Sequence, residues 1–202
     1  MEDKKWEDYD TIKCPDGQII DMRQLLADQE NAKVALIRIM PWLGGFIGRL
    51  RFVYTFRVQT QATDGYNLFV NPQFTYNLNL LQKTFVLAHE VMHCLLNHMR
   101  RSLGRGDDPN KSNVAADYEA NIALADIPPV SVSMVKGMHA LIDEKYRKMS
   151  YEEIYDKVSN SGDSQQNQQG EKDAQKNNKY SADYKEGWNQ AMEDYKAGKI
   201  SI

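Results

Sequence analysis

The stretch that decides the fold is Thr84–Leu96, T-F-V-L-A-H-E-V-M-H-C-L-L, which contains His-Glu-x-x-His. It is apolar on nearly every side of a helix, and such helices are buried. Histidines four positions apart lie about 40° apart around a helix, so the imidazoles of His89 and His93 can reach one metal ion. Burying the two imidazoles costs free energy unless they have partners, and a single bound metal ion can be the partner of both. The alternative is a chance pentapeptide whose histidines satisfy local hydrogen bonds, and the buried context disfavours it.

Glu90 lies beside the two histidines and predicts the chemistry of the site. Zinc held by three protein ligands keeps one position for water. The Glu90 carboxylate can take a proton from that water, which attacks a carbonyl group, and then pass the proton to a leaving amine. The pattern predicts Zn²⁺ as cofactor, Glu90 as general base and a peptide or protein as substrate.

The third ligand must come from another segment, and Ala115–Asn121 is the strongest candidate. Its alanines allow the helix that carries it to approach the metal helix closely. Asp117 shares a face with Asn121, whose amide can orient a ligand. Glu119 points about 160° away, toward a face without polar support. We therefore predict Asp117 as the ligand; the alternative is a solvated acidic face.

Three further side chains are weaker candidates. In a helix that continues to Met99, His98 lies about 140° from His93, so we interpret it as a helix-end histidine favoured by the macrodipole. His139 and Tyr118 are candidates for stabilising a tetrahedral intermediate. For His139, an ordinary surface or core histidine is the favoured interpretation.

Periodicity along the chain predicts an α+β fold, with N-terminal helices, a small β-hairpin and the buried metal helix packed against a second, ligand-bearing helix. A loop is expected from Gly104 to Pro109. Helices are expected at 21–40, 41–50, 79–99, 113–125 and 151–158, and strands at 51–60 and 66–70.

Composition divides the chain into a folded domain at 1–158, a polar linker at 159–179 and an amphipathic helix at 180–202. The linker has one small apolar residue, Ala174. The last helix carries an apolar stripe that can bind a protein partner, a second copy or the chain's own domain. The stripe consists of Tyr184, Trp188, Met192 and Tyr195.

Charge and hydropathy exclude several functions. The 25 basic and 28 acidic residues of this 202-residue chain give a net charge of −3, which argues against a nucleic-acid-binding surface. No apolar run is long enough for a membrane span, and Met1–Trp6 shows no secretory signal. Cys14 and Cys94 are too few for a disulfide framework. We therefore expect a cytoplasmic protein without membrane or nucleic-acid partners.

An ordered set of motifs resembles a family of metallopeptidase domains that often precede a VWA-like domain in bacterial proteins and have phage-encoded relatives. The resemblance covers roughly residues 30–158. Its motifs are Ala62-Thr63-Asp64-Gly65, Asn71-Pro72-x-Phe74, Phe85–His93, Asn113-x-Ala115-Ala116-Asp117-x-x-x-Asn121, Leu141-Ile142-Asp143-x-x-Tyr146 and Met149-Ser150-x-Glu152-x-Ile154-Tyr155.

The resemblance implies a zincin-like fold, zinc-dependent peptidase activity and Asp117 as a ligand. It also implies that an edge strand, 66–70 or 51–60, pairs with extended substrate. The alternative for both strands is an ordinary core position. The alternative function is a catalytically silent, metal-stabilised scaffold or interaction module, such as a phage structural or regulatory component. The intact Glu90 favours the enzyme, because a structural zinc site needs no general base.

Overall fold

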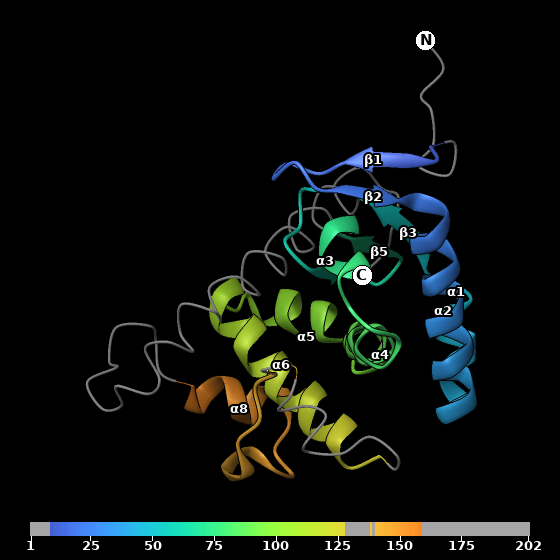
Figure 1. The fold of residues 1–202 in the computed structure, drawn as a ribbon. Helices are drawn as coiled ribbons and strands as arrows, with labels where there is room; N and C mark the ends of the chain where they lie inside the picture. The colour runs from blue at the N-terminus through green and yellow to red at the C-terminus, as the bar shows by residue number, and fades with distance from the viewer. Residues whose placement is uncertain (1–8, 128–137, 139, 159–202) are drawn as a thin grey trace.

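The computed structural model describes residues 9–127, 138 and 140–158, which form a mixed helix and sheet fold (Figure 1). The predicted linker, the predicted C-terminal helix and His139 lie outside these residues. No described helix combines the length and apolar character needed to cross a bilayer. The elements are β1 (Thr11–Lys13), β2 (Ile19–Asp21), α1 (Met22–Ile39), the 3-10 helix η2 (Pro41–Leu43), α2 (Gly44–Ile47), β3 (Arg51–Tyr54), β4 (Gln61–Thr63), β5 (Asn67–Val70), α3 (Pro72–Tyr76), α4 (Leu80–Leu95), α5 (His98–Arg105), α6 (Pro109–Ala125), the 3-10 helix η3 (Glu144–Tyr146) and α8 (Tyr151–Lys157).

The main sheet has three strands in the order β3-β5-β4. β4 pairs antiparallel with β5, whereas β3 pairs parallel with it, so the predicted hairpin between 51–60 and 66–70 is wrong. The strand that begins at Arg51 ends at Tyr54 because β5 is only four residues long and gives way to α3. Val58 is nevertheless buried, so beyond Tyr54 the alternation of apolar residues indicates burial and not strand pairing. β5 is the central strand and has no free edge for a substrate.

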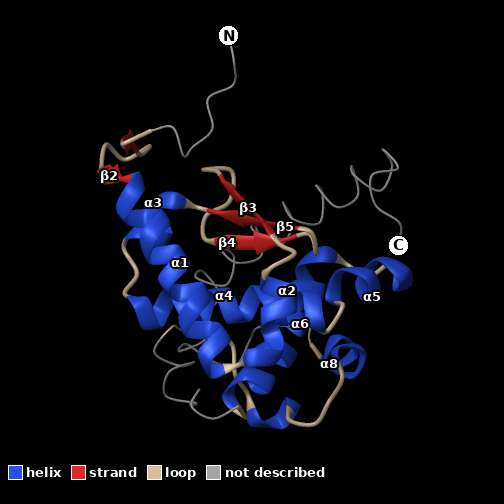
Figure 2. Cartoon of the chain, turned by 90° about the vertical axis from the view of Figure 1, so that its right-hand side faces the viewer, coloured by secondary structure: helices blue, strands red, loops and turns tan. Residues whose placement is uncertain are grey.

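Helices α1 and α4 pack against each other, and both contribute buried side chains to the main core (Figure 2). The Asp21 side chain caps α1 by accepting a hydrogen bond from the Gln24 amide at 3.1 Å. Asn79 and Gln82 form the predicted capping box at the start of α4. The packing of α4 against α1 embeds the helix that carries the two histidines in the core.

The end of α4 differs from the prediction. The helix ends at Leu95 instead of continuing to about Met99, because Asn97 adopts a left-handed conformation with φ of 56°. Asparagine tolerates this conformation better than most residues. A separate helix, α5, starts at His98 and ends at Arg105, so of the predicted loop only residues 106–108 lie outside the helices.

Helix α6 lies against α4 and carries the second half of the site. It begins at Pro109 rather than Asn113, because Asp108 caps it and proline suits the first helical position. α8 packs on α6, and its predicted capping box of Ser150 and Glu153 is present. Helix α4, which carries His89 and His93, is thus in contact with α6, and α6 in turn with α8.

Candidate metal centre

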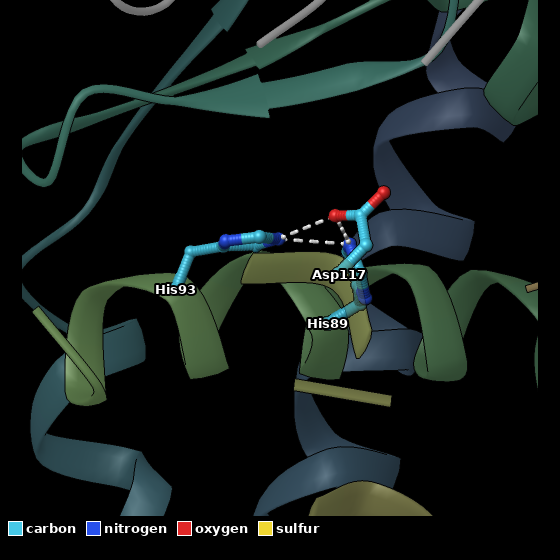
Figure 3. A group of neighbouring side chains, drawn as sticks. All are labelled: His89, His93 and Asp117. Atoms are coloured by element: carbon cyan, nitrogen blue, oxygen red, sulfur yellow. Dashed lines mark hydrogen bonds and ion pairs between the residues drawn. The ribbon is translucent and has the colours of Figure 1, made fainter. Parts of the chain in front are cut away.

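Three side chains from two helices converge on one point. His89 and His93 extend from one face of α4 toward the carboxylate of Asp117, which comes from α6 (Figure 3). The two Nε2 atoms are 2.9 Å apart, and Asp117 Oδ1 is 3.3 Å from each. In a tetrahedral zinc site with bonds of about 2.1 Å, neighbouring ligand atoms lie about 3.4 Å apart. The donor set and its spacing fit a metal ion, and His89, His93 and Asp117 are the group of described residues that could hold one.

Asn121 orients His89 as the sequence predicted. Its Oδ1 lies 2.9 Å from His89 Nδ1, and its Nδ2 donates to the carbonyl oxygen of Leu141 at 3.0 Å. Because that second bond assigns the amide nitrogen, Oδ1 accepts a hydrogen from His89 Nδ1. The lone pair of His89 Nε2 in the neutral ring then faces Asp117 and can bind a metal.

Electrostatics distribute the protons unequally over the three groups. Burial lowers the pKa of His89, but the hydrogen bond and charge of Asp117, with smaller effects of Glu90 and Asn121, outweigh it and raise the pKa to about 9. Burial and the adjacent charged His89 lower the pKa of His93 to about 4. Burial opposes ionisation of Asp117, yet the two histidines hold its pKa well below its ordinary value. At neutral pH the metal-free site therefore holds a charged His89 beside an ionised Asp117.

Glu90 is buried next to this group, with 7% of its surface exposed. It lines two cavities, both of which also contact His89 and Asp117. Its negative charge acts on His89, so the two side chains are close. A carboxylate in this position can exchange a proton with a water molecule at the metal site.

A cleft of about 390 Å³ opens at the site. Its walls are α4, α5, α6, the strand β4 with the turn that follows it, and the end of α2. Beyond the three ligands and Glu90, its lining includes Phe46, Arg49, Gln61, Thr63, Tyr66, Asn97, Met99, Arg100 and Leu103. A smaller, largely apolar pocket of about 50 Å³ adjoins His89, Glu90 and Asp117 on another side. The cleft is large enough to hold several residues of a peptide.

His98 and Glu119 are placed differently from the prediction. His98 is fully buried at the start of α5, and its Nδ1 lies 2.9 Å from His93 Nδ1. Its Nε2 lies 2.7 Å from Glu119, which also accepts from Arg101 at 2.9 Å. The prediction assumed one continuous helix, and the break at Asn97 turns His98 back toward His93. Glu119 thus has two polar partners from α5, which the residues on its own face of α6 do not predict.

The other candidate side chains are not part of the group of three ligands. Tyr118 packs its ring on Tyr146 at 4.6 Å between centroids and lines neither cavity. Burial raises the pKa of the Cys94 thiol to about 12, so this cysteine stays protonated. Arg101 and Arg105 of α5 are held by carboxylates of α6, of α8 and of Asp107, which lies between α5 and α6.

The site combines two histidines one helical turn apart, a carboxylate from a second helix and a buried glutamate in a cleft, which is the combination of side chains that metal-dependent hydrolases use. The chain belongs to the putative metallopeptidase domain family, whose model matches residues 25–201. The resemblance seen in the sequence is thereby confirmed, and the match continues past residue 158. No curated protein and no solved structure gives a significant match.

Proposed function

We propose that the protein is a zinc-dependent peptidase with a zincin-like arrangement of its metal helix and sheet. The observation that carries the proposal is the convergence of His89, His93 and Asp117 at one end of a cleft that Glu90 also lines. Two nitrogen donors and one carboxylate oxygen match the ligand set of catalytic zinc sites, which leave one position open. Membership of a metallopeptidase domain family supports the same activity.

His89, His93 and Asp117 would hold the zinc. When bound there, zinc supplies Lewis-acid polarisation of the scissile carbonyl and makes water more acidic. Glu90 accepts the proton of the attacking water on its carboxylate and delivers it to the leaving nitrogen. The burial of Glu90 excludes bulk water from this proton transfer, and Asn121 keeps His89 in the tautomer that binds metal.

The proposed binding site for an extended substrate is the outer edge of β4, with which no strand pairs in the described part of the chain. Thr60 accepts from Asn71 and Asp64 donates to Asn67, so the peptide groups at these two positions face β5. Hydrogen-bonding direction alternates along an antiparallel strand, so the peptide groups of Gln61 and Thr63 face the opposite edge. Both residues line the cleft. A substrate strand added there would lie beside the metal ligands.

The charge of the cleft favours acidic peptides. Arg49 and Arg100 line it, both are exposed, and no ion pair holds either one within the part of the chain that the structure describes. Asp64, the acidic residue of the β4 turn, already accepts from the backbone amides of Tyr66 and Asn67 at 2.8 and 2.6 Å. The two guanidinium groups can therefore pair with carboxylates of a substrate.

The test compares zinc-loaded wild type with Glu90→Gln on a library of quenched fluorescent peptides. Glu30→Gln, on the exposed face of α1, is the matched control. We expect wild type and Glu30→Gln to cleave peptides until a chelator removes the zinc. Glu90→Gln should bind zinc but cleave about 10²- to 10⁴-fold more slowly, as expected for loss of a general base. A Glu90→Gln variant as active as wild type would refute the assignment. Zinc binding with no hydrolysis in wild type would favour the metal-stabilised scaffold instead.

A further inference from the structure

Behind His93, on the side away from Asp117, four polar side chains form a continuous column. His93 Nδ1 contacts His98 Nδ1 at 2.9 Å, and His98 Nε2 contacts Glu119 at 2.7 Å. Arg101 donates to the same Glu119 oxygen at 2.9 Å and, through two nitrogens, to Glu152 of α8 at 2.8 and 2.6 Å. The column therefore connects the candidate metal centre to α5, α6 and α8.

The hydrogens in this column can be assigned from its chemistry. An ionised carboxylate only accepts, so Glu119, which is held by Arg101, receives a hydrogen from His98 Nε2. With one hydrogen on its ring, His98 has an acceptor at Nδ1. The hydrogen between the two histidines must then belong to His93 Nδ1. This leaves the lone pair of His93 on Nε2, the atom that faces His89 and Asp117.

We propose that His98 and Glu119 are positioning residues that hold His93 in the orientation and tautomer that bind the metal. The inference rests on the proposed metal centre. Metal-ligating histidines usually donate their other ring hydrogen to a carboxylate, carbonyl or water. In this protein a second histidine lies between the ligand and the carboxylate, and it extends that contact from α4 to α6.

Burying the polar side chains of this column costs free energy, which argues that the column has a role at the candidate metal centre. His98 has no exposed surface and Glu119 is 15% exposed, so two polar side chains are removed from water. Such groups are costly unless every partner is satisfied, and in the column each one is. The left-handed Asn97 directs His98 back to His93, and Arg101 also caps α4 by donating to the carbonyl of Leu96. A continuous helix would need neither feature.

The test measures zinc affinity by competition with a chromophoric chelator for the full chain and four variants. His98→Leu removes the acceptor for His93, whereas His98→Asn keeps an oxygen at the position of Nδ1. Glu119→Ala removes the carboxylate, and Asp126→Ala, an exposed acid at the end of α6, is the matched control. The visible spectrum of cobalt(II) bound in place of zinc reports the ligand arrangement independently of activity. Melting temperature of each metal-free variant shows whether the fold is retained.

We expect His98→Leu and Glu119→Ala to bind zinc about 10- to 100-fold more weakly, with altered cobalt spectra. His98→Asn should recover most of the lost affinity, and Asp126→Ala should match wild type. Equal affinity in all proteins would overturn the proposal. So would an equal loss in His98→Leu and His98→Asn, because packing of the ring would then explain it. If wild type does not bind zinc, the proposed metal centre itself is refuted.

Discussion

Zinc binding should release one proton from the site at mildly acidic pH. Without metal, the pKa of His89 is raised to about 9 and that of His93 is lowered to about 4. At pH 6.5 His89 is therefore protonated by roughly 300 to 1, whereas His93 is already neutral. The metal needs a neutral His89, so the proton must leave when zinc binds.

The size of the effect follows from this single proton. Apparent zinc affinity should rise about tenfold per pH unit below the pKa of His89, or about 30-fold between pH 5.5 and 7. Zinc affinity rises with pH because the raised pKa of His89 stabilises the protonated, metal-free form. Protons stop competing with zinc for His89 as pH rises through about 9.

Calorimetry at pH 6.5 in buffers of different ionisation enthalpy counts the released protons directly. Wild type should release one proton per zinc. Asp117→Asn is the matched comparison, because it removes the charge that raises the pKa of His89 and leaves burial, which lowers it. Its proton release should fall well below one, although it binds zinc more weakly. Zinc binding by wild type without proton release would refute the assigned charge distribution.

Three further outcomes are expected. Arg49→Glu with Arg100→Glu should reduce the preference for peptides with Asp or Glu over Lys by about tenfold, measured as relative kcat/KM; an unchanged preference would exclude the two arginines from substrate binding. Asp117→Ala should weaken zinc binding at least 100-fold in chelator competition, whereas the exposed Asp126→Ala should not, and equal affinities would exclude Asp117 as a ligand. Asp28→Ala should lower the free energy of unfolding in urea by about 3 kcal/mol, because it leaves the buried Lys83 without its partner at 2.6 Å, whereas loss of the exposed pair in Glu30→Ala should cost less than about 1 kcal/mol.

Local sequence signals predicted the parts of the site that depend on single helices. The capping box at Asn79 and the spacing of His89 and His93 need only helical geometry, and both are present. The small residues around Asp117 and the position of Asn121 likewise predicted which side of α6 faces α4. Asp117 Oδ1 lies 3.3 Å from both histidines, and Asn121 contacts His89, in agreement with that interpretation.

The errors arise where one residue or one partner changes the direction of the chain. The sequence pattern does not mark Asn97 as a helix break, so it predicts the wrong helix and the wrong direction for His98. Asparagine in an otherwise apolar and basic helical stretch was the available signal. The predicted strand from Arg51 is too long because alternation of apolar residues indicates burial but carries no information about the length of the partner strand. Contacts between distant segments, such as Glu119 with Arg101, depend on that tertiary arrangement.

The most direct test of the metal centre is an anomalous difference map, measured at the zinc edge, from crystals grown with zinc. The structure predicts one strong peak bonded to His89 Nε2, His93 Nε2 and a carboxylate oxygen of Asp117, with Glu90 beside it and His98 behind His93. A peak bonded to Glu119, His98 or His139, with Asp117 turned to solvent, would contradict the account.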